Sequence, residues 1–499
     1  MTETEHLDVL IVGAGLSGVG AARRLATELP ARSYAILEAR DAVGGTWDLF
    51  RYPGVRSDSD MHTLGYSARP WTKAKAIVDG PSIRSYIRDT AAEAGIDSRI
   101  RFGHKVTSAS WSTRDSRWTV EADHGGTPVR LTARFLYLCT GYYRYDAGFT
   151  PDFPGRDDFG GTVVHPQQWP EDLDYSGKRV VVIGSGATAI TLVPAMTDKA
   201  AHVTMLQRTP TYITTLPQID PLVTSLSKVI GEERAYPIVK WKNVLTQAAF
   251  YQFCQRHPGL ARAALRKLAV RQLPEGFDVD THFKPPYNPW DQRLCVVPDG
   301  DLFRAIRDGS ASVVTDRIAS FTKTGLSLES GAELKADVVV TATGLRLLAF
   351  GDIKLSVDGA DVNLPDRMSY KGMMLSGVPN FAYTIGYTNA SWTLKADLVS
   401  QYVVRLLRHM STRGYDQAVP VADPSVGTRP LLDFAAGYVL RSIDAFPKAG
   451  DKGPWATSMS YPRDIARLRF GKVDDDAMKF TRRSDAPAPE KTPVGASAS

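Results

Sequence analysis

The 499-residue chain has only three cysteines and no long apolar run. Cys139, Cys254 and Cys295 are too far apart to form a disulfide framework, which indicates a reducing compartment. No apolar stretch reaches the roughly 18 residues that a membrane-spanning helix needs. The polar, acidic start from Met1 to Asp8 lacks the basic and apolar regions of a signal peptide. We therefore expect a cytoplasmic protein.

The chain also has no block of basic residues that would bind a polynucleotide, so we expect no nucleic-acid partner. Its 60 Lys and Arg exceed its 54 Asp and Glu by only six, and 43% of its residues are hydrophobic. This is an ordinary globular composition. The basic, aromatic-bearing region from Lys240 to Arg271 fits either a solvated helix face or peripheral contact with anionic lipid. The sequence leaves the oligomeric state open.

The segment from Leu7 to Glu38 reads as strand, glycine turn, helix and strand. Gly13 permits the tight turn, Gly15 lets the backbone approach a pyrophosphate, and Gly18 lets the helix pack on the strand. Glu38 ends the second strand, where a carboxylate binds a ribose 2′-OH and repels a 2′-phosphate. This pattern predicts a site for FAD or NAD rather than NADP.

The same order returns at Gly184-Ser185-Gly186-Ala187-Thr188-Ala189. Here the second strand ends at Arg208 and Thr209, which present a guanidinium and a hydroxyl instead of a carboxylate. These groups suit a 2′-phosphate. One site that refuses this phosphate and one that accepts it make FAD and NADPH the simplest pair of cofactors.

The fold class that we predict is α/β, with two dinucleotide-binding (Rossmann-like) domains. The FAD domain would be split, with residues 1–145 as its first part and 336–483 as its second. The NADPH domain would be inserted at 146–335, with a helical insertion at about 211–285. Similar small-residue turns at the ends of 134–141 and 337–344 would mark the two chain crossings. We expect the Pro-, Ala- and Ser-rich tail, 484–499, to be disordered.

Two further segments combine glycine, aromatic and charged residues. In Gly44–Asp58, the Gly-Gly pair lets backbone approach a flat ring, Trp47 offers apolar cover, and Asp58 suits a polar ring group or a cation. Phe159–Pro170 precedes the second nucleotide motif and contains His165. On its own, such a histidine is more often structural than catalytic, and it would lock the linker between the lobes.

Phe159–Pro170 fits the pattern FxGxxxHxxxWP of the type I Baeyer–Villiger monooxygenases, and Gly44–Asp58 fits their companion pattern. With the two nucleotide motifs, the chain resembles this family from Leu7 to Lys479. The resemblance implies an NADPH- and O₂-dependent FAD enzyme that converts ketones to esters or lactones through a C4a-peroxyflavin. The match looks closest to a thioamide-activating bacterial branch, which implies S-oxygenation of thioamides and sulfides as well.

The resemblance also implies roles for individual residues. It implies that Arg293 stabilises anions beside the flavin and that Asp58 holds and tunes this arginine. The flavin-binding residues that the motifs and the resemblance predict are Gly13, Gly15, Ser17, Gly18, Glu38, Gly45, Thr46, Trp47, Asp48, Leu49, Asp58 and Val106. The predicted NADPH-binding residues are Arg56, Ser57, Asp58, Gly184, Ser185, Gly186, Ala187, Thr188, Ala189, Ile190, Arg208 and Thr209. The linker motif comprises Phe159, Gly161, His165 and Trp169, and we expect no metal site.

One position departs from the family pattern. Many members carry a Lys before the active-site arginine, where it helps bind the 2′-phosphate, but this chain has Gln292. The resemblance therefore implies that NADPH preference rests mainly on Arg208. Two alternatives remain open: a flavin-containing N- or S-monooxygenase, and a non-catalytic NADPH/FAD redox sensor. A flavin disulfide reductase would need a nearby cysteine pair, which the isolated cysteines do not offer.

Overall fold

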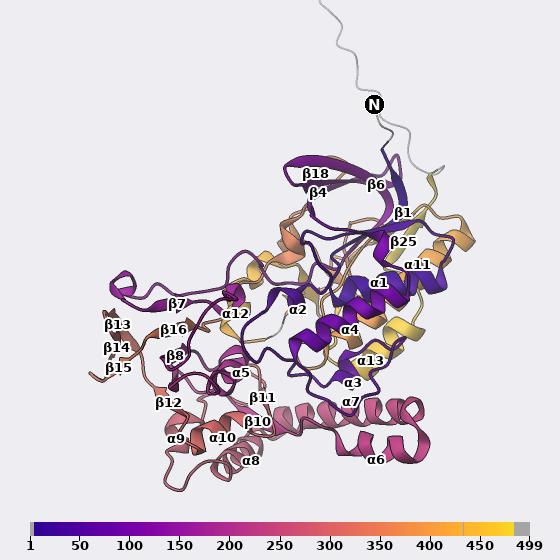
Figure 1. Cartoon of the computed structure of the whole chain (residues 1–499). Coiled ribbons are helices and arrows are strands. Elements are labelled where there is room, and N and C mark those ends of the chain that lie inside the picture. Colours follow the sequence, from indigo (N-terminus) through magenta and orange to yellow (C-terminus); the bar gives the residue numbers. More distant parts are fainter. Residues whose placement is uncertain (1–3, 433, 484–499) are drawn as a thin grey trace, which may run out of the picture.

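A computed structural model describes residues 4–432 and 434–483. Two lobes, each built on its own sheet, lie side by side above a group of helices (Figure 1). The first lobe contains the N-terminal and C-terminal parts of the chain, and the second contains the middle part. The tail that we expected to be disordered, 484–499, lies outside the described residues.

The first lobe is built on a nine-stranded sheet in the order β18-β17-β4-β5-β6-β1-β2-β3, with β21 also paired to β6. The β1–β2 and β1–β6 pairs are parallel, whereas β4, β5 and β6 form an antiparallel meander. The strands are β1 His6–Val12, β2 Tyr34–Leu37, β3 Ile100–Arg101, β4 His104–Ser112, β5 Arg117–His124, β6 Thr127–Leu138, β17 Lys354–Val357, β18 Ala360–Asp361 and β21 Phe381–Tyr383.

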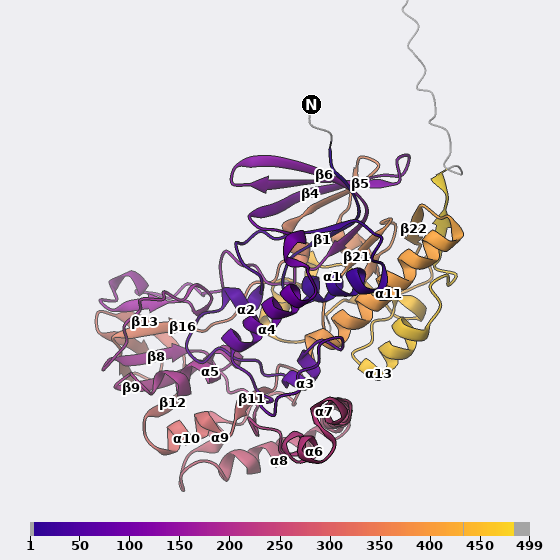
Figure 2. The same cartoon turned by 45° about the vertical axis from the view of Figure 1, so that its right-hand side comes forward.

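Strand β1 is apolar along its length because both faces of this sheet are covered. Val9 and Ile11 point into one core, together with helices on that face, and Leu10 and Val12 point into a second core on the other face. The helices α1 (Leu16–Glu28) and α11 (Trp392–Arg413) pack against each other, and α4 (Gly80–Glu93) lies beside α1 (Figure 2). This packing fixes the N-terminus of α1 at the carboxyl end of β1.

The inserted lobe has a five-stranded parallel sheet in the order β12-β9-β8-β16-β7. Its strands are β7 Thr162–Val164, β8 Arg179–Ile183, β9 His202–Gln207, β12 Ala311–Thr315 and β16 Val338–Thr341. Val180 and Val182 point to one core and Val181 and Ile183 to another, so β8 is also covered on both faces. The helices α5 (Ala187–Met196) and α10 (Asp301–Arg307) pack against each other in this lobe.

Strand β16 corrects one predicted boundary. We began the second part of the first domain at residue 336, but β16 pairs with β7 and β8 in the sheet of the inserted lobe. Its run of buried valines lies between the parallel strands β7 and β8, and only the strand pairing shows that β16 belongs to this sheet. We therefore propose that the chain returns to the first lobe after Gly344.

The predicted helical insertion is present, but it is entered through a strand. Ile213–Leu216 forms β10, which pairs in parallel with β11, Cys295–Pro298, so the helical part is shorter than 211–285. The helices are α6 Pro221–Ile230, α7 Glu232–Arg256, α8 Pro258–Val270 and α9 Val279–His282. Within the described residues, none of the helices is both long enough and apolar enough to cross a membrane. Ile238, Trp241 and Leu245 nevertheless leave an exposed apolar face on α7.

Short elements complete the two lobes. The remaining strands are β13 Ile318–Thr322, β14 Gly325–Leu328, β15 Glu333–Lys335, β19 Ser369–Tyr370, β20 Met374–Leu375, β22 Gln417–Pro420, β23 Thr428–Pro430, β24 Lys448–Gly450 and β25 Met478–Thr481. The remaining α-helices are α2 Thr46–Leu49, α3 Met61–Leu64, α12 Gly437–Leu440 and α13 Tyr461–Asp464.

Candidate active site

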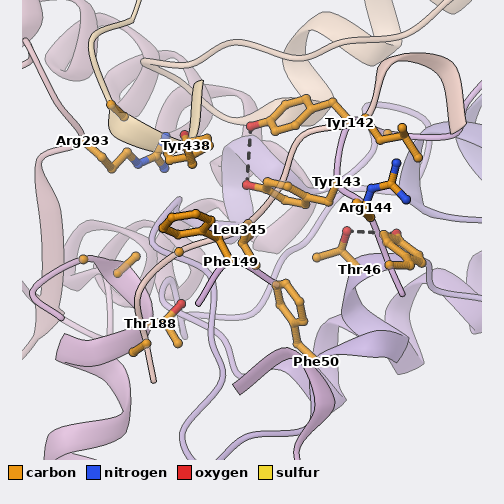
Figure 3. Close-up of a pocket in the computed structure, with 18 of the residues that line it drawn as sticks. Thr46, Phe50, Tyr142, Tyr143, Arg144, Phe149, Thr188, Arg293, Leu345 and Tyr438 are labelled. Atoms are coloured by element: carbon orange, nitrogen blue, oxygen red, sulfur yellow. Dashed lines mark hydrogen bonds between the residues drawn. The ribbon is translucent and has the colours of Figure 1, made fainter. Parts of the chain in front are cut away.

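One cavity of about 1490 Å³ runs between the lobes and is lined by both glycine turns. Sites for one small ligand usually measure roughly 300–1,000 Å³, so this cavity is large enough for more than one. The carboxyl ends of β1 and β8 both open onto it, as expected for nucleotide sites in parallel sheets. Figure 3 shows its central part, where aromatic side chains and Arg293 converge.

The first glycine turn has the shape of a phosphate cradle. Gly13 has φ +103°, and a Cβ there would lie 2.6 Å from the carbonyl oxygen of Cys139. A Cβ on Gly18 would lie 1.8 Å from the carbonyl oxygen of Gly13, so only glycine lets α1 sit this close to the turn. Gly15 caps α1 without a side-chain acceptor, which leaves the positive end of the helix for a bound anion.

Glu38 lies at the wall of the cavity, where the sequence predicts a ribose-binding carboxylate. Its carboxylate accepts hydrogen bonds from the backbone N–H groups of Ala14, at 2.7 Å, and Arg40, at 3.0 Å. Burial raises the pKa of Glu38, while these N–H groups act in the opposite direction. Val106 lines the same end of the cavity, so the structure brings together these two predicted residues.

The second glycine turn has the same design. Gly186 caps α5 without a side-chain acceptor, and a Cβ on it would meet nothing within 4 Å. The hydroxyl of Ser185 donates to the carbonyl oxygen of Thr209, at 2.9 Å, and thereby ties the turn to the end of β9. Arg208 lines the cavity beside this contact and is exposed. The predicted 2′-phosphate residues therefore line the cavity beside the second glycine turn.

Arg293 and Asp58 come from different lobes and form a bidentate ion pair. Nε and Nη2 of Arg293 donate to the two carboxylate oxygens of Asp58 at 3.0 and 2.8 Å, and Nη1 donates to the carbonyl oxygen of Thr388 at 2.8 Å. Burial disfavours the charge on Arg293, but Asp58, together with Tyr438 and Tyr142, acts in the opposite direction and the pKa of the guanidinium rises. The side chain keeps 30% of its surface exposed while lining the cavity.

The sequence analysis missed an aromatic wall around Arg293. Tyr142, Tyr143, Phe149 and Tyr438 line the cavity next to this arginine (Figure 3). The hydroxyl oxygens of Tyr142 and Tyr143 lie 3.5 Å apart. Tyr142 and Tyr143 directly follow the turn after β6, which the sequence marked as a crossing between lobes, so their position was a usable signal. Tyr438 carried no such signal.

Several predicted residues do not face the cavity. Asp48 is 3% exposed and bound by Arg40, Arg51 and Arg84 at 2.6, 2.8 and 2.9 Å, so its charge is satisfied within the protein. Leu49, on the same short helix, is also outside the lining, so the cavity does not place either residue at the flavin and their roles stay predictions. Gly18 and Ala189 pack behind their glycine turns. The other predicted nucleotide-binding residues line the cavity: Gly13, Gly15, Ser17, Glu38, Gly45, Thr46, Trp47, Arg56, Ser57, Asp58, Val106, Gly184, Ser185, Gly186, Ala187, Thr188, Ile190, Arg208 and Thr209.

Two of the lining residues have partners that the sequence did not indicate. The hydroxyl of Ser17 accepts a hydrogen bond from the indole of Trp392, at 2.8 Å, so α11 helps fix the start of α1. Arg56 pairs with Asp301 of the inserted lobe, with an N–O distance of 2.5 Å. Arg56 therefore joins the two lobes as well as lining the cavity.

The linker motif lies beside the main cavity. Nδ1 of His165 accepts from the backbone N–H of Gln167, and Nε2 lies 3.2 Å from the carbonyl oxygen of Gly344. Burial lowers the pKa of His165, which favours a neutral ring that donates from Nε2. The histidine thus bonds to the second chain crossing, and its role in locking the linker stays a prediction. Phe159 packs on Phe321, a Cβ on Gly161 would lie 2.4 Å from the carbonyl oxygen of Asp337, and Trp169 packs on Tyr175.

The fold and the cavity define an oxidoreductase-type architecture with two nucleotide sites facing each other. The chain belongs to the family described as flavin-binding monooxygenase-like, whose model matches residues 7–364. This match confirms the prediction of a flavin monooxygenase.

Relatives and solved structures agree. The chain is 58% identical to the FAD-containing monooxygenase EthA of Mycobacterium tuberculosis (strain ATCC 25618 / H37Rv) over 490 residues, which cover 97% of this chain and 99% of that protein. It is 52% identical to the EthA of Mycolicibacterium smegmatis, with 97% and 99% coverage. A steroid monooxygenase solved in its oxidised form with NADP has 23% identity and a TM-score of 0.75, covering 96% of this chain and 100% of that one. The predicted fold, with two nucleotide-binding domains, is therefore confirmed.

We predict that Gly18→Ala prevents flavin binding. The new Cβ would collide with the backbone of the Gly13 turn, so α1 would have to move away from the cradle. Purified protein should lose its yellow colour, measured as the ratio of absorbance at 450 nm to that at 280 nm. Gly259→Ala, on α8 with nothing within 4 Å of its Cβ, is the control and should keep the flavin. Full flavin content in Gly18→Ala would contradict this packing argument.

Proposed function

We propose that the protein is an FAD- and NADPH-dependent monooxygenase of the Baeyer–Villiger type, which converts ketones to esters or lactones. The observation that carries the proposal is Arg293, held by Asp58 and Thr388 at the wall of a cavity shared by both nucleotide turns. The glycine turns, the open helix N-termini and Glu38 fit FAD at the first site. Arg208 and Thr209 fit NADPH at the second.

Bound FAD would supply the electrons and the oxygen activation that protein side chains cannot provide. The protein's part is to place the substrate carbonyl next to Arg293 and to stabilise the negative charge that develops on the substrate oxygen. A guanidinium has five N–H groups, and the three hydrogen bonds recorded here leave one free on Nη1 and one on Nη2. The fork is therefore fixed in orientation and still able to bind a ligand.

The aromatic wall has a complementary role. Tyr142, Tyr143, Phe149 and Tyr438 line the cavity that Arg293 also lines, and their bulk limits the water that can reach the arginine. Fewer waters strengthen the interaction of Arg293 with an anion, because the local dielectric falls. Sulfides and thioamides are a second substrate class that we propose for the same site, since soft sulfur accepts an oxygen atom readily.

The proposed function predicts that NADPH oxidation accelerates when an aliphatic or aryl ketone is added to the purified holoenzyme. The product should gain 16 Da, the mass of one oxygen atom, by mass spectrometry. Panels of sulfides, thioamides and amines separate this activity from N- and S-oxygenation. If every substrate yields only hydrogen peroxide, the monooxygenase assignment fails. An absence of oxygen consumption would favour a redox sensor instead.

Arg293→Ala should keep flavin reduction by NADPH but lose ester formation. Removal of one preorganised donor of this kind costs on the order of 10²–10³ in rate. Stopped-flow reduction under anaerobic conditions and product yield in air measure the two steps separately. Arg293→Lys retains the positive charge but not the planar, forked guanidinium. Its ester yield should therefore lie between those of the wild type and of Arg293→Ala. Ester yield equal to the wild type in Arg293→Ala would remove this residue from the mechanism.

Arg208→Ala should raise the KM for NADPH by about 10- to 100-fold, the value of a hydrogen bond to a charged group. The KM for NADH should change little, because NADH has no 2′-phosphate. Steady-state kinetics with both nucleotides give the ratio. Arg114→Ala, on an exposed turn of the first lobe, is the control. An equal loss with both nucleotides would show that Arg208 does not read the 2′-phosphate.

A further inference from the structure

The third anchor of Arg293 is a backbone carbonyl on a loop. Thr388 lies between β21 and α11, in a stretch that forms neither helix nor strand. Its carbonyl oxygen accepts from Nη1 of Arg293, at 2.8 Å. Because no sheet or helix fixes this oxygen, its position depends on the side chains that hold the loop.

The segment Met459–Asp464 holds this loop at three successive residues. The hydroxyl of Tyr387 donates to Oδ2 of Asp464 at 2.7 Å, and the hydroxyl of Thr388 contacts the sulfur of Met459 at 3.8 Å. The side-chain amide of Asn389 donates to the carbonyl oxygen of Met459, at 3.0 Å. The strongest of these contacts is the one from Tyr387, because its acceptor is charged.

Asp464 is itself held rigidly. It is 1% exposed, and Nζ of Lys395 on α11 lies 2.7 Å from the same oxygen that accepts from Tyr387. Burial lowers the pKa of Lys395, and Asp464 acts against this by favouring the charged amine. Burial and Asp464 both raise the pKa of Tyr387, so its hydroxyl keeps the proton that it donates. The carboxylate is thus a fixed point to which the loop is tied.

We propose that Tyr387 and Asp464 are positioning residues for Arg293, acting through the carbonyl oxygen of Thr388. Their hydrogen bond sets the position of the 387–389 loop relative to Arg293. The loop in turn sets the orientation of the guanidinium in the cavity. The inference rests on the proposed function for its kinetic consequence. Its structural consequence, the position of Arg293, does not depend on that function.

The chain contains a second cluster of the same kind, which provides a matched control. Lys371 lies 3.0 Å from Asp475, and the hydroxyl of Tyr370 donates to the same carboxylate at 2.8 Å. Neither Tyr370 nor Asp475 lines the cavity or contacts the loop that carries Thr388. Tyr370 and Tyr387 are both buried, although Tyr387 also lines the cavity, so Tyr→Phe removes in each cluster one buried hydroxyl that donates to a carboxylate.

The test compares crystal structures of the wild-type holoenzyme, Tyr387→Phe and Tyr370→Phe, grown under the same conditions. In Tyr387→Phe we expect the bond from Arg293 to Thr388 to lengthen beyond hydrogen-bonding distance, or the guanidinium to occupy a second orientation. Both other structures should keep the bond. An intact bond in Tyr387→Phe, with Arg293 in its wild-type orientation, overturns the proposal.

The kinetic readout is the yield of oxygenated product per NADPH consumed, with the rate of anaerobic flavin reduction measured separately. Misplacing a catalytic group by about 1 Å can cost up to 10²-fold, so we expect the yield in Tyr387→Phe to fall by roughly 10- to 100-fold. Flavin reduction should be unchanged, and Tyr370→Phe should keep the wild-type yield. Equal losses of yield in the two variants would indicate general destabilisation and overturn the proposal.

Asp464→Asn serves as a second variant, although it leaves buried Lys395 without a counter-charge and will lower stability. If Asp464 acts through Tyr387, a double variant that combines Tyr387→Phe with Asp464→Asn should lose no more product yield than the single variant with the lower yield. Additive losses would contradict that route. If the wild type oxygenates no substrate, the proposed function fails, while the crystal structures still decide whether Tyr387 positions Arg293.

Discussion

The structure around the cavity depends on one ion pair that joins the two lobes, between Arg293 and Asp58. Two charges that partly leave water cost free energy, and good geometry together with further hydrogen bonds to the charged groups offsets this cost. Here the planar guanidinium meets both oxygens of the carboxylate, and a backbone carbonyl takes a third N–H group. Such a pair fixes the orientation of the guanidinium more than it adds stability. Removal of either partner would leave the other charge uncompensated.

The pair also restricts how the lobes move. Arg56, two residues before Asp58, bonds to Asp301 of the inserted lobe, and His165 bonds to the crossing segment at Gly344. A rotation of the inserted lobe would have to break the Arg293–Asp58 and Arg56–Asp301 pairs together, since both of them join the two lobes.

The sequence predicted those parts of the site that are local in the chain. Gly13, Gly18 and Glu38 could be identified because a strand, a turn and a helix that follow one another bring them together. The pairing of Arg293 with Asp58 joins residues 235 positions apart, and only a family resemblance placed them in one site. The three arginines that bind Asp48 come from different segments, and the strand pairing of β16 cannot be read from a run of valines, so the sequence predicted neither. Thr388 contributes a backbone oxygen, which no side-chain pattern reveals.

The tyrosines around Arg293 explain how the site can combine a charge with an apolar wall. Burial raises the pKa of Tyr142, Tyr143 and Tyr438 above the usual range, so each hydroxyl remains neutral at physiological pH. An ionised tyrosine would be a second anion competing with a ligand for the two N–H groups that Asp58 and Thr388 leave free. Neutral hydroxyls do not compete in this way, and their rings keep water from the guanidinium. The burial that strengthens the attraction of the arginine for an anion is thus the same burial that keeps the neighbouring hydroxyls neutral even at alkaline pH.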